Sequence, residues 1–170
     1  KENYIKLSHQ LIFLLVALAA GFTPLFFLPL TSEFFEFNKF SLLVVVTVLG
    51  LLLWAARMVL EKKFVLTRTP LDIPLLVLTV GFFIASLTSI DSFTSLVGPL
   101  GRPWPSFFGI VTLTAFYFVT TSNIKTRKQA ETILAILVGS TTIAAFLAIS
   151  AYFGSYLPFD FAKNHGFSPL

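Results

Sequence analysis

Five long stretches without any charged residue constrain the fold of this chain more than any other feature of its sequence. They cover residues 11–30, 40–56, 73–90, 103–124 and 132–159. Each is about long enough to cross a hydrocarbon core of roughly 30 Å as an α-helix, which rises 1.5 Å per residue. None alternates apolar with polar residues, as a strand of a membrane barrel must. The stretches therefore predict an all-α, polytopic membrane helix bundle with about five transmembrane helices.

The scarcity of charge supports the same interpretation. Only 12% of the 170 residues are charged and 56% are hydrophobic, whereas soluble domains carry about a quarter charged residues. This composition also excludes disordered and collagen-like chains. The chain has no cysteine, so it forms no disulfide and no thiolate metal site. The lipid bilayer is the expected surrounding of most of the chain.

The basic residues are unevenly distributed between the segments that flank these stretches. Nine of the twelve lie in alternate segments and three in the others. Because cytoplasmic loops are enriched in Lys and Arg, the N-terminus is predicted to be cytoplasmic and residue 170 external. The net charge of +4 then reports topology, and no nucleic-acid partner is expected.

The expected spans form one transmembrane domain over residues 1–170 and lie near 11–30, 40–60, 73–90, 105–124 and 132–157. Gly21 and Pro24 interrupt the first span, which is expected to be a retained, proline-kinked helix. A cleaved signal peptide is the alternative, with the small residues Ala17 and Ala19 at its cleavage site.

Local signals predict several helix ends. Asp72 is expected to cap the third span, and Pro103 and Pro105 are expected to open the fourth. Trp104 is expected at the outer membrane interface and Trp54 at the inner one, where amphipathic rings gather.

Arg102 is the candidate substrate-binding residue. It is the one basic residue in the external segment 91–105, where several Gly and Pro residues predict defined turns. A guanidinium presents a fixed fork of donors, which suits an anionic group such as a lipid-linked diphosphate or a sugar. The alternative role is to anchor a helix end to lipid headgroups.

The remaining polar residues are expected to serve structure. His9 and His165 have no metal-ligand partners at suitable spacing, so no metal site is expected. Glu33 and Glu36 are expected to be solvated carboxylates. No catalytic residue is expected in this chain.

Two basic clusters and one stripe of small residues are also expected to have structural roles. The clusters at 57–68 and 125–128 are expected to set orientation, with binding of anionic lipid as the alternative. Ser140, Ala144 and Ala148 recur every four residues and are expected to let another helix approach closely.

Four segments resemble the N-terminal half of bacterial O-antigen ligase-like membrane proteins, a family that includes O-antigen polymerases and protein O-oligosaccharyltransferases. They read PLFFLPLTSEFFEFNK (24–39), TPLDIPLL (69–76), SIDSFTSLVGPLGRPWPSFFG (89–109) and NIKTRKQAETIL (123–134). The stretch from Gly98 to Gly109 is the most similar piece, because family members carry Gly, Arg and Gly before the next helix. Here Pro103, Trp104 and Pro105 replace the polar or acidic residues that usually follow that Arg.

The resemblance implies transfer of a glycan from an undecaprenyl diphosphate carrier to an acceptor on the outer face of the bacterial inner membrane. It implies a lipid-linked oligosaccharide as partner, with no metal or nucleotide cofactor. The family's key Arg and His residues belong to a later external loop. The chain is therefore expected to be the N-terminal fragment of a larger protein, inactive alone, with the later helices of that protein as partners. The alternatives are a transporter or flippase subunit and a non-catalytic structural domain.

Overall fold

The computed structural model describes residues 2–26, 36–63, 66–99 and 102–152. All regular secondary structure in these four segments is helical, which confirms the all-α prediction. The six helices found there are α1 (Glu2–Phe22), α2 (Glu36–Glu61), α3 (Asp72–Leu87), α4 (Ser92–Val97), α5 (Phe107–Asn123) and α6 (Arg127–Tyr152).

Two of these helices are long and apolar enough to cross a membrane. They are Glu36–Glu61 and the part of α6 from Arg127 to Ser150, which contain 18-residue windows with mean hydropathies of 2.4 and 2.2. The apolar helices Leu7–Phe22, Asp72–Leu87 and Phe107–Asn123 are shorter.

Several predicted boundaries are wrong. The expected kink at Pro24 is a helix end, because α1 stops at Phe22 and a turn follows in which the Leu25 N–H donates to the Phe22 carbonyl. The third helix ends at Leu87, three residues early, and the short α4 follows it. Polar residues from Thr88 to Ser92 favour this interruption, since their side chains bond to nearby backbone groups and compete with the helix.

Neither predicted helix start holds. Leu71 precedes the first turn of α3 without a side-chain cap, and Asp72 is itself the first helical residue. Ser106 caps α5 by accepting a hydrogen bond from the Gly109 N–H, so Pro103 and Pro105 lie before the helix. A serine hydroxyl is a stronger N-terminal signal than a nearby proline, because it satisfies a free helical N–H.

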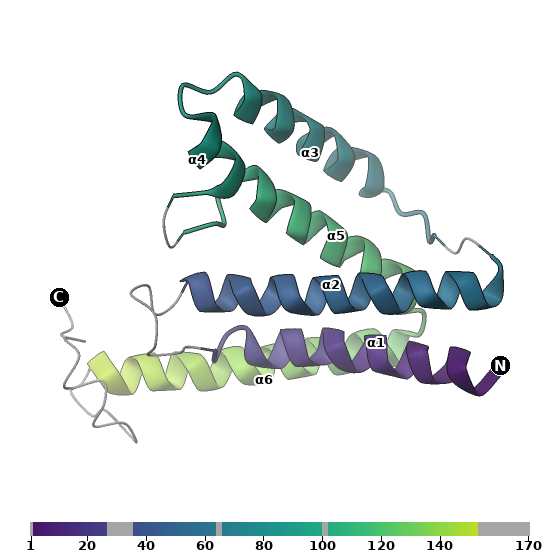
Figure 1. Ribbon diagram of the computed structural model, residues 1–170. Coiled ribbons are helices and arrows are strands. Elements are labelled where there is room, and N and C mark those ends of the chain that lie inside the picture. Colours follow the sequence, from purple (N-terminus) through teal and green to yellow (C-terminus); the bar gives the residue numbers. More distant parts are fainter. Residues whose placement is uncertain (1, 27–35, 64–65, 100–101, 153–170) are drawn as a thin grey trace.

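The five longer helices run in alternating directions (Figure 1). The start of α1, the end of α2, the start of α3, the end of α5 and the start of α6 lie at one end of the molecule. We call this the basic end, because most of the described Lys and Arg residues belong to it. The opposite end, called the loop end, holds α4 and the described residues 98–99 and 102–106.

The core lies where α1, α2 and α5 meet. Its buried side chains are Ile12, Val16, Trp54 and Val119. A Cβ built on Gly50 would lie 3.0 Å from a Val119 methyl carbon, so the missing side chain lets α2 and α5 approach closely. Trp54 is 8% exposed, and its predicted place at the inner membrane interface is therefore an interior position between helices.

Outside this core the helices pack in pairs. Helix α6 lies against α1, while α3 contacts α5 and α4. The Thr79 and Thr114 hydroxyls, 3.1 Å apart, link α3 to α5. Large apolar side chains remain exposed along α3 and α6, including Ile73, Val77 and Phe146 at 74%, 66% and 69%. The arrangement thus leaves broad hydrophobic surfaces on both flanks.

Candidate functional site

The candidate site is the loop that joins α4 to α5 at the loop end. Gly98 begins it with a φ of +101°, a backbone conformation that side chains with a Cβ rarely adopt. A Cβ on Gly98 would also lie 2.7 Å from Pro103 Cα and 3.0 Å from the Arg102 carbonyl oxygen. Gly98 therefore lies directly against the backbone of Arg102 and Pro103.

The far side of the loop is equally close-packed. A Cβ on Gly109 would lie 2.5 Å from the carbonyl oxygen of Trp104 and 2.7 Å from that of Pro103. The Ser106 side chain is buried, and its hydroxyl donates to the Pro103 carbonyl at 2.6 Å. Gly98, Gly109 and the Ser106 cap therefore pack closely against the backbone of residues 102–104.

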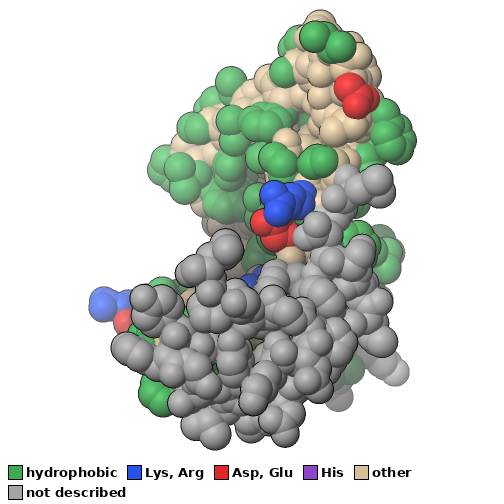
Figure 2. Space-filling model, turned by 90° about the vertical axis from the view of Figure 1, so that its left-hand side faces the viewer, with side chains coloured by type: hydrophobic (Ala, Val, Ile, Leu, Met, Phe, Trp, Pro, Cys, Tyr) green, Lys and Arg blue, Asp and Glu red, His purple; other side chains and the backbone are tan. Residues whose placement is uncertain are grey.

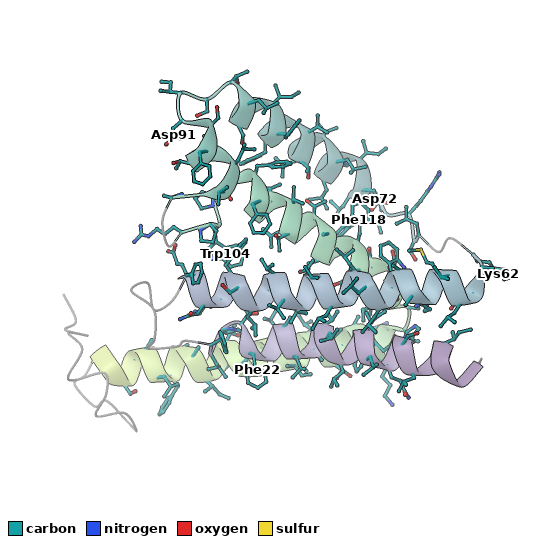
Figure 3. The ribbon with its side chains drawn as sticks, viewed as in Figure 1. Phe22, Lys62, Asp72, Asp91, Trp104 and Phe118 are labelled. Atoms are coloured by element: carbon teal, nitrogen blue, oxygen red, sulfur yellow. The ribbon has the colours of Figure 1, made fainter. Side chains whose placement is uncertain are left out.

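Aromatic contacts hold this loop on α2. The rings of Trp104 and Phe40 meet edge to face with centroids 5.2 Å apart, and Phe108 meets Phe40 at 5.6 Å. Phe40 is buried at the start of α2, and Trp104, labelled in Figure 3, is half-buried. The indole expected at the lipid interface is thus also a packing contact between the loop and α2.

Arg102 projects from this braced loop toward solvent. Its Nε lies 3.7 Å from Glu36 Oε2, and the two side chains are 63% and 48% exposed. Figure 2 looks onto this end of the molecule, where basic and acidic side chains touch. The structure thus brings together two residues that the sequence treated separately.

Among the described residues, the pairing with Glu36 gives the guanidinium of Arg102 an ion pair but no hydrogen bond. A separation of 3.7 Å is an ion pair but too long for a hydrogen bond. Within the described segments no other side chain bonds to this guanidinium. Exposed ion pairs contribute about 0–1 kcal/mol, so a more highly charged oxyanion would compete readily with one carboxylate. Chemically, the site can bind an anion at the edge of the helix bundle.

A second polar cluster, which the sequence did not predict, lies at the basic end. Arg57 is 2% exposed, and its Nη1 donates to Asn123 Oδ1 at 2.6 Å, joining α2 to α5. Its Nε lies 3.0 Å from Glu61 Oε1, although the N–H is not directed at that oxygen. The Ser122 hydroxyl and the Trp54 indole N–H are buried without a partner among the described residues.

A third cluster surrounds Asp72 at the same end. The backbone N–H and the hydroxyl of Thr69 donate to its carboxylate at 2.8 and 2.7 Å, and the Tyr117 hydroxyl donates at 3.1 Å. These bonds, above all the one from the Thr69 backbone, hold the pKa of Asp72 below 3.8. Asp72 therefore ties the α2–α3 connection to α5 instead of capping α3.

The remaining candidates are dispersed. His9 is half-buried on α1, whereas Glu33 and His165 lie outside the described residues. Across the described segments no three His, Cys, Asp or Glu side chains gather into a metal site. Ser140 is buried, and its hydroxyl donates to the Ala20 carbonyl of α1 at 3.1 Å, as its packing role predicts. Ala148, at the other end of the same stripe, is exposed.

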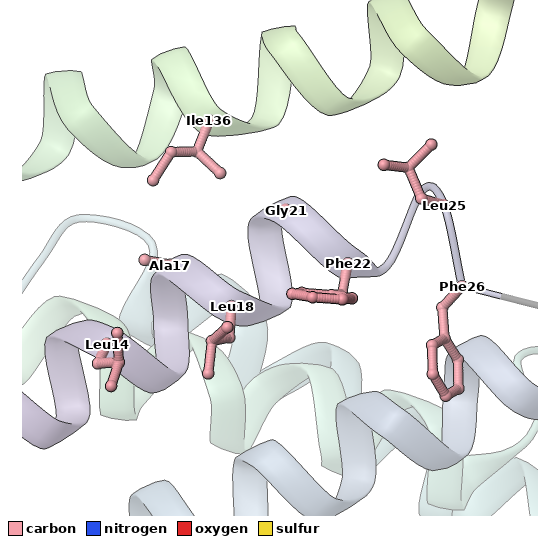
Figure 4. A pocket seen from close by; sticks show the side chains of 8 residues that line it. All are labelled: Leu14, Ala17, Leu18, Gly21, Phe22, Leu25, Phe26 and Ile136. Atoms are coloured by element: carbon pink, nitrogen blue, oxygen red, sulfur yellow. The ribbon is translucent and has the colours of Figure 1, made fainter.

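An apolar groove lies between α1 and α6. It has a volume of about 540 Å³, and Figure 4 shows its eight lining residues: Leu14, Ala17, Leu18, Gly21, Phe22, Leu25, Phe26 and Ile136. None carries a polar side chain, so the groove offers surface to hydrocarbon but no group for chemistry.

Comparison with protein-family models, with curated proteins and with solved structures finds no match to this chain.

Proposed function

We propose that this chain is a five-span domain of the bacterial inner membrane and the N-terminal membrane part of an O-antigen ligase-like glycosyltransferase. The alternating directions of α1, α2, α3, α5 and α6 support five crossings. The exposed apolar flanks support a lipid surrounding, because soluble monomers rarely expose contiguous apolar patches above a few hundred Å².

The two shortest of the five proposed spans, α3 and α5, are compatible with this topology. Helices α3 and α5 have 16 and 17 residues, which rise about 24–26 Å. A shorter span is accommodated by local thinning of the bilayer. Polar turns follow α3 and precede α5, and these turns would lie in the headgroup region.

The distribution of charge supports an orientation. Apart from buried Arg57, the described cationic side chains of the basic end are Lys62, Lys63, Arg68, Lys125, Arg127 and Lys128. The loop end carries Lys39 and Arg102 among its described residues. The basic end is then cytoplasmic, and the Arg102 loop faces the external side.

The observation that carries this proposal is the exposed guanidinium of Arg102, which makes no hydrogen bond among the described residues and belongs to a segment that packs against α2. In glycan transfer from an undecaprenyl diphosphate carrier, negative charge develops on the departing diphosphate. A positioned Arg stabilises that charge as it forms, and its fork matches the phosphate oxygens. Arg102 binds the carrier diphosphate in this proposal, and Glu36 is the carboxylate that the diphosphate displaces.

Binding of undecaprenyl diphosphate to the chain in nanodiscs tests this role. Arg102→Ala should lower affinity about 10- to 100-fold, since hydrogen bonds to charged groups contribute about 1.5–3 kcal/mol. Arg102→Lys should bind more tightly than Arg102→Ala, because lysine keeps the positive charge but lacks the planar set of guanidinium donors. Glu36→Gln should raise affinity a few-fold, because two exposed charges about 4 Å apart interact with about 1–4 kcal/mol before screening.

Arg102→Ala is expected to lower the affinity for the carrier and Glu36→Gln to raise it, and this opposition distinguishes substrate binding from a structural role. If the Arg102–Glu36 pair merely held the loop on α2, both substitutions would break the same contact and change binding in the same direction. If both substitutions change the affinity equally, or if Arg102→Ala does not change it, Arg102 does not bind the diphosphate and its role is to anchor a helix end. The same substitution made in the intact gene should reduce glycan transfer in cells at unchanged protein levels.

A further inference from the structure

A small hollow with hydroxyl groups on its wall lies beside the Arg102 loop. It is formed where the end of α3, α4 and the residues before α5 meet, and has a volume of about 180 Å³. Its lining residues are Phe82, Ala85, Ser86, Ser89, Ser95 and Pro105. No step of the proposed diphosphate binding uses these side chains.

Hydrogen bonds link the three serines, one through a backbone carbonyl and one between two hydroxyl groups. Ser86 is 4% exposed, and its hydroxyl donates to the Ser95 carbonyl at 3.2 Å. The Ser95 hydroxyl donates to the Ser89 hydroxyl at 2.8 Å. The proton of the Ser89 hydroxyl has no acceptor within the described part of the chain, so the series ends in a free donor. Each hydroxyl also keeps a lone pair able to accept.

The volume of the hollow and the side chains that line it suit a single sugar ring. A volume of 180 Å³ equals about six waters at roughly 30 Å³ each, which is on the order of one sugar ring. A pyranose has hydroxyls that both donate and accept, and it has an apolar C–H face. Ser89 and Ser95 match the hydroxyls, while the half-buried Phe82 ring gives an apolar surface for the C–H face.

The hollow also lies within reach of the anion site. Pro105 lines it, and Pro105 is only three positions after Arg102 in the sequence. Their Cα atoms can therefore be at most about 11 Å apart. In a lipid-linked glycan the first sugar is bonded directly to the diphosphate. We propose that this hollow binds the first pyranose of the carrier-linked glycan while Arg102 binds the diphosphate, an inference that rests on the proposed function.

Binding of carriers with and without a sugar separates the two sites. The probes are undecaprenyl diphosphate alone and the same carrier bearing one glucose, galactose or N-acetylglucosamine. We expect at least one glycosylated probe to bind more tightly than the bare carrier. Ser89→Ala should weaken that probe about 3- to 10-fold, the effect of losing one hydrogen bond, and leave the bare carrier unchanged. Ala85→Leu, which fills the hollow, should act in the same way.

Thr88→Ala is the matched control. Thr88 is the neighbour of Ser89, but its exposed hydroxyl donates to carbonyls of its own helix, so this variant should bind every probe normally. Arg102→Ala should weaken all probes. If the bare carrier binds through Arg102 but Ser89→Ala and Ala85→Leu do not alter any sugar preference, the hollow is not a sugar site and the diphosphate site stands. Failure of every probe to bind overturns both proposals.

Discussion

The buried contact between Arg57 and Asn123 should make Asn123→Ala one of the most destabilising substitutions in the chain. Asn123 is fully buried, accepts from Arg57 Nη1 at 2.6 Å and donates to the Val119 carbonyl at 2.7 Å. Hydrogen bonds between membrane helices contribute about 0.6 kcal/mol on average when neutral. A hydrogen bond to a charged group contributes about 1.5–3 kcal/mol, and truncation leaves the guanidinium short of a partner. The expected loss is about 2–4 kcal/mol.

Reversible unfolding in mixed detergent micelles, followed by circular dichroism, measures this loss. Arg57→Met should cost about 1–3 kcal/mol, because it leaves the Asn123 amide without its donor. The double variant Arg57→Met/Asn123→Leu removes both partners of the hydrogen bond, so it should cost at least about 1 kcal/mol less than the sum of Arg57→Met and Asn123→Leu alone. Thr142→Ala is the control, since this exposed hydroxyl bonds only to the Val138 carbonyl of its own helix. Additive losses, or an Asn123→Ala cost within about 0.5 kcal/mol of the control, would refute the reasoning.

Three further predictions follow from contacts elsewhere in the bundle. Gly109→Ala should cost about 1–3 kcal/mol, because the new methyl meets backbone atoms of Trp104 and Pro103. Gly139→Ala, with no neighbour within 4 Å, should gain up to about 1 kcal/mol of helix propensity in the same unfolding assay; equal behaviour of the two would contradict the packing argument. The pKa of Asp72 is lowered by folding, so its contribution to stability is complete above 3.8 and is lost as pH falls through the folded-state pKa. The stability difference between the native chain and Asp72→Asn should accordingly shrink on acidification, and a constant difference from pH 7 to pH 3 would argue against this role. Ser140→Leu should separate α1 from α6 at Ala20 and slow crosslinking of a Gly21→Cys/Ile136→Cys pair, whereas Thr141→Leu on the exposed face should not.

The helical class and the approximate positions of the long helices could be predicted from sequence, because uncharged stretches of 17 or more residues have few alternatives to helices. Helix ends were less predictable. Asp72 has the residue type of a cap, but its carboxylate accepts hydrogen bonds from Thr69, three residues earlier, instead of from the first turn of α3. Proline near Phe107 suggested a helix start, yet the buried Ser106 hydroxyl determines it.

The candidate site could be predicted only in part. Arg102 stood out as an isolated cation in a Gly- and Pro-rich loop. Its neighbour Glu36 is 66 positions away in the sequence, and no local pattern connects the two. Arg57 was counted with the cytoplasmic cations, but it is buried beside Asn123. Charge counting locates a residue along the chain, whereas its burial depends on which helix faces meet.

The central claim is that the chain crosses the membrane with its basic end in the cytoplasm and the Arg102 loop outside. The chain has no native cysteine, so single cysteines placed at exposed positions can report their side directly. Phe93→Cys on α4 and Lys62→Cys after α2 mark the two ends. In spheroplasts, a membrane-impermeant maleimide should label Phe93→Cys at once and Lys62→Cys only after permeabilisation. The reverse order, or immediate labelling of both, would contradict the topology and remove the basis for an external Arg102 site.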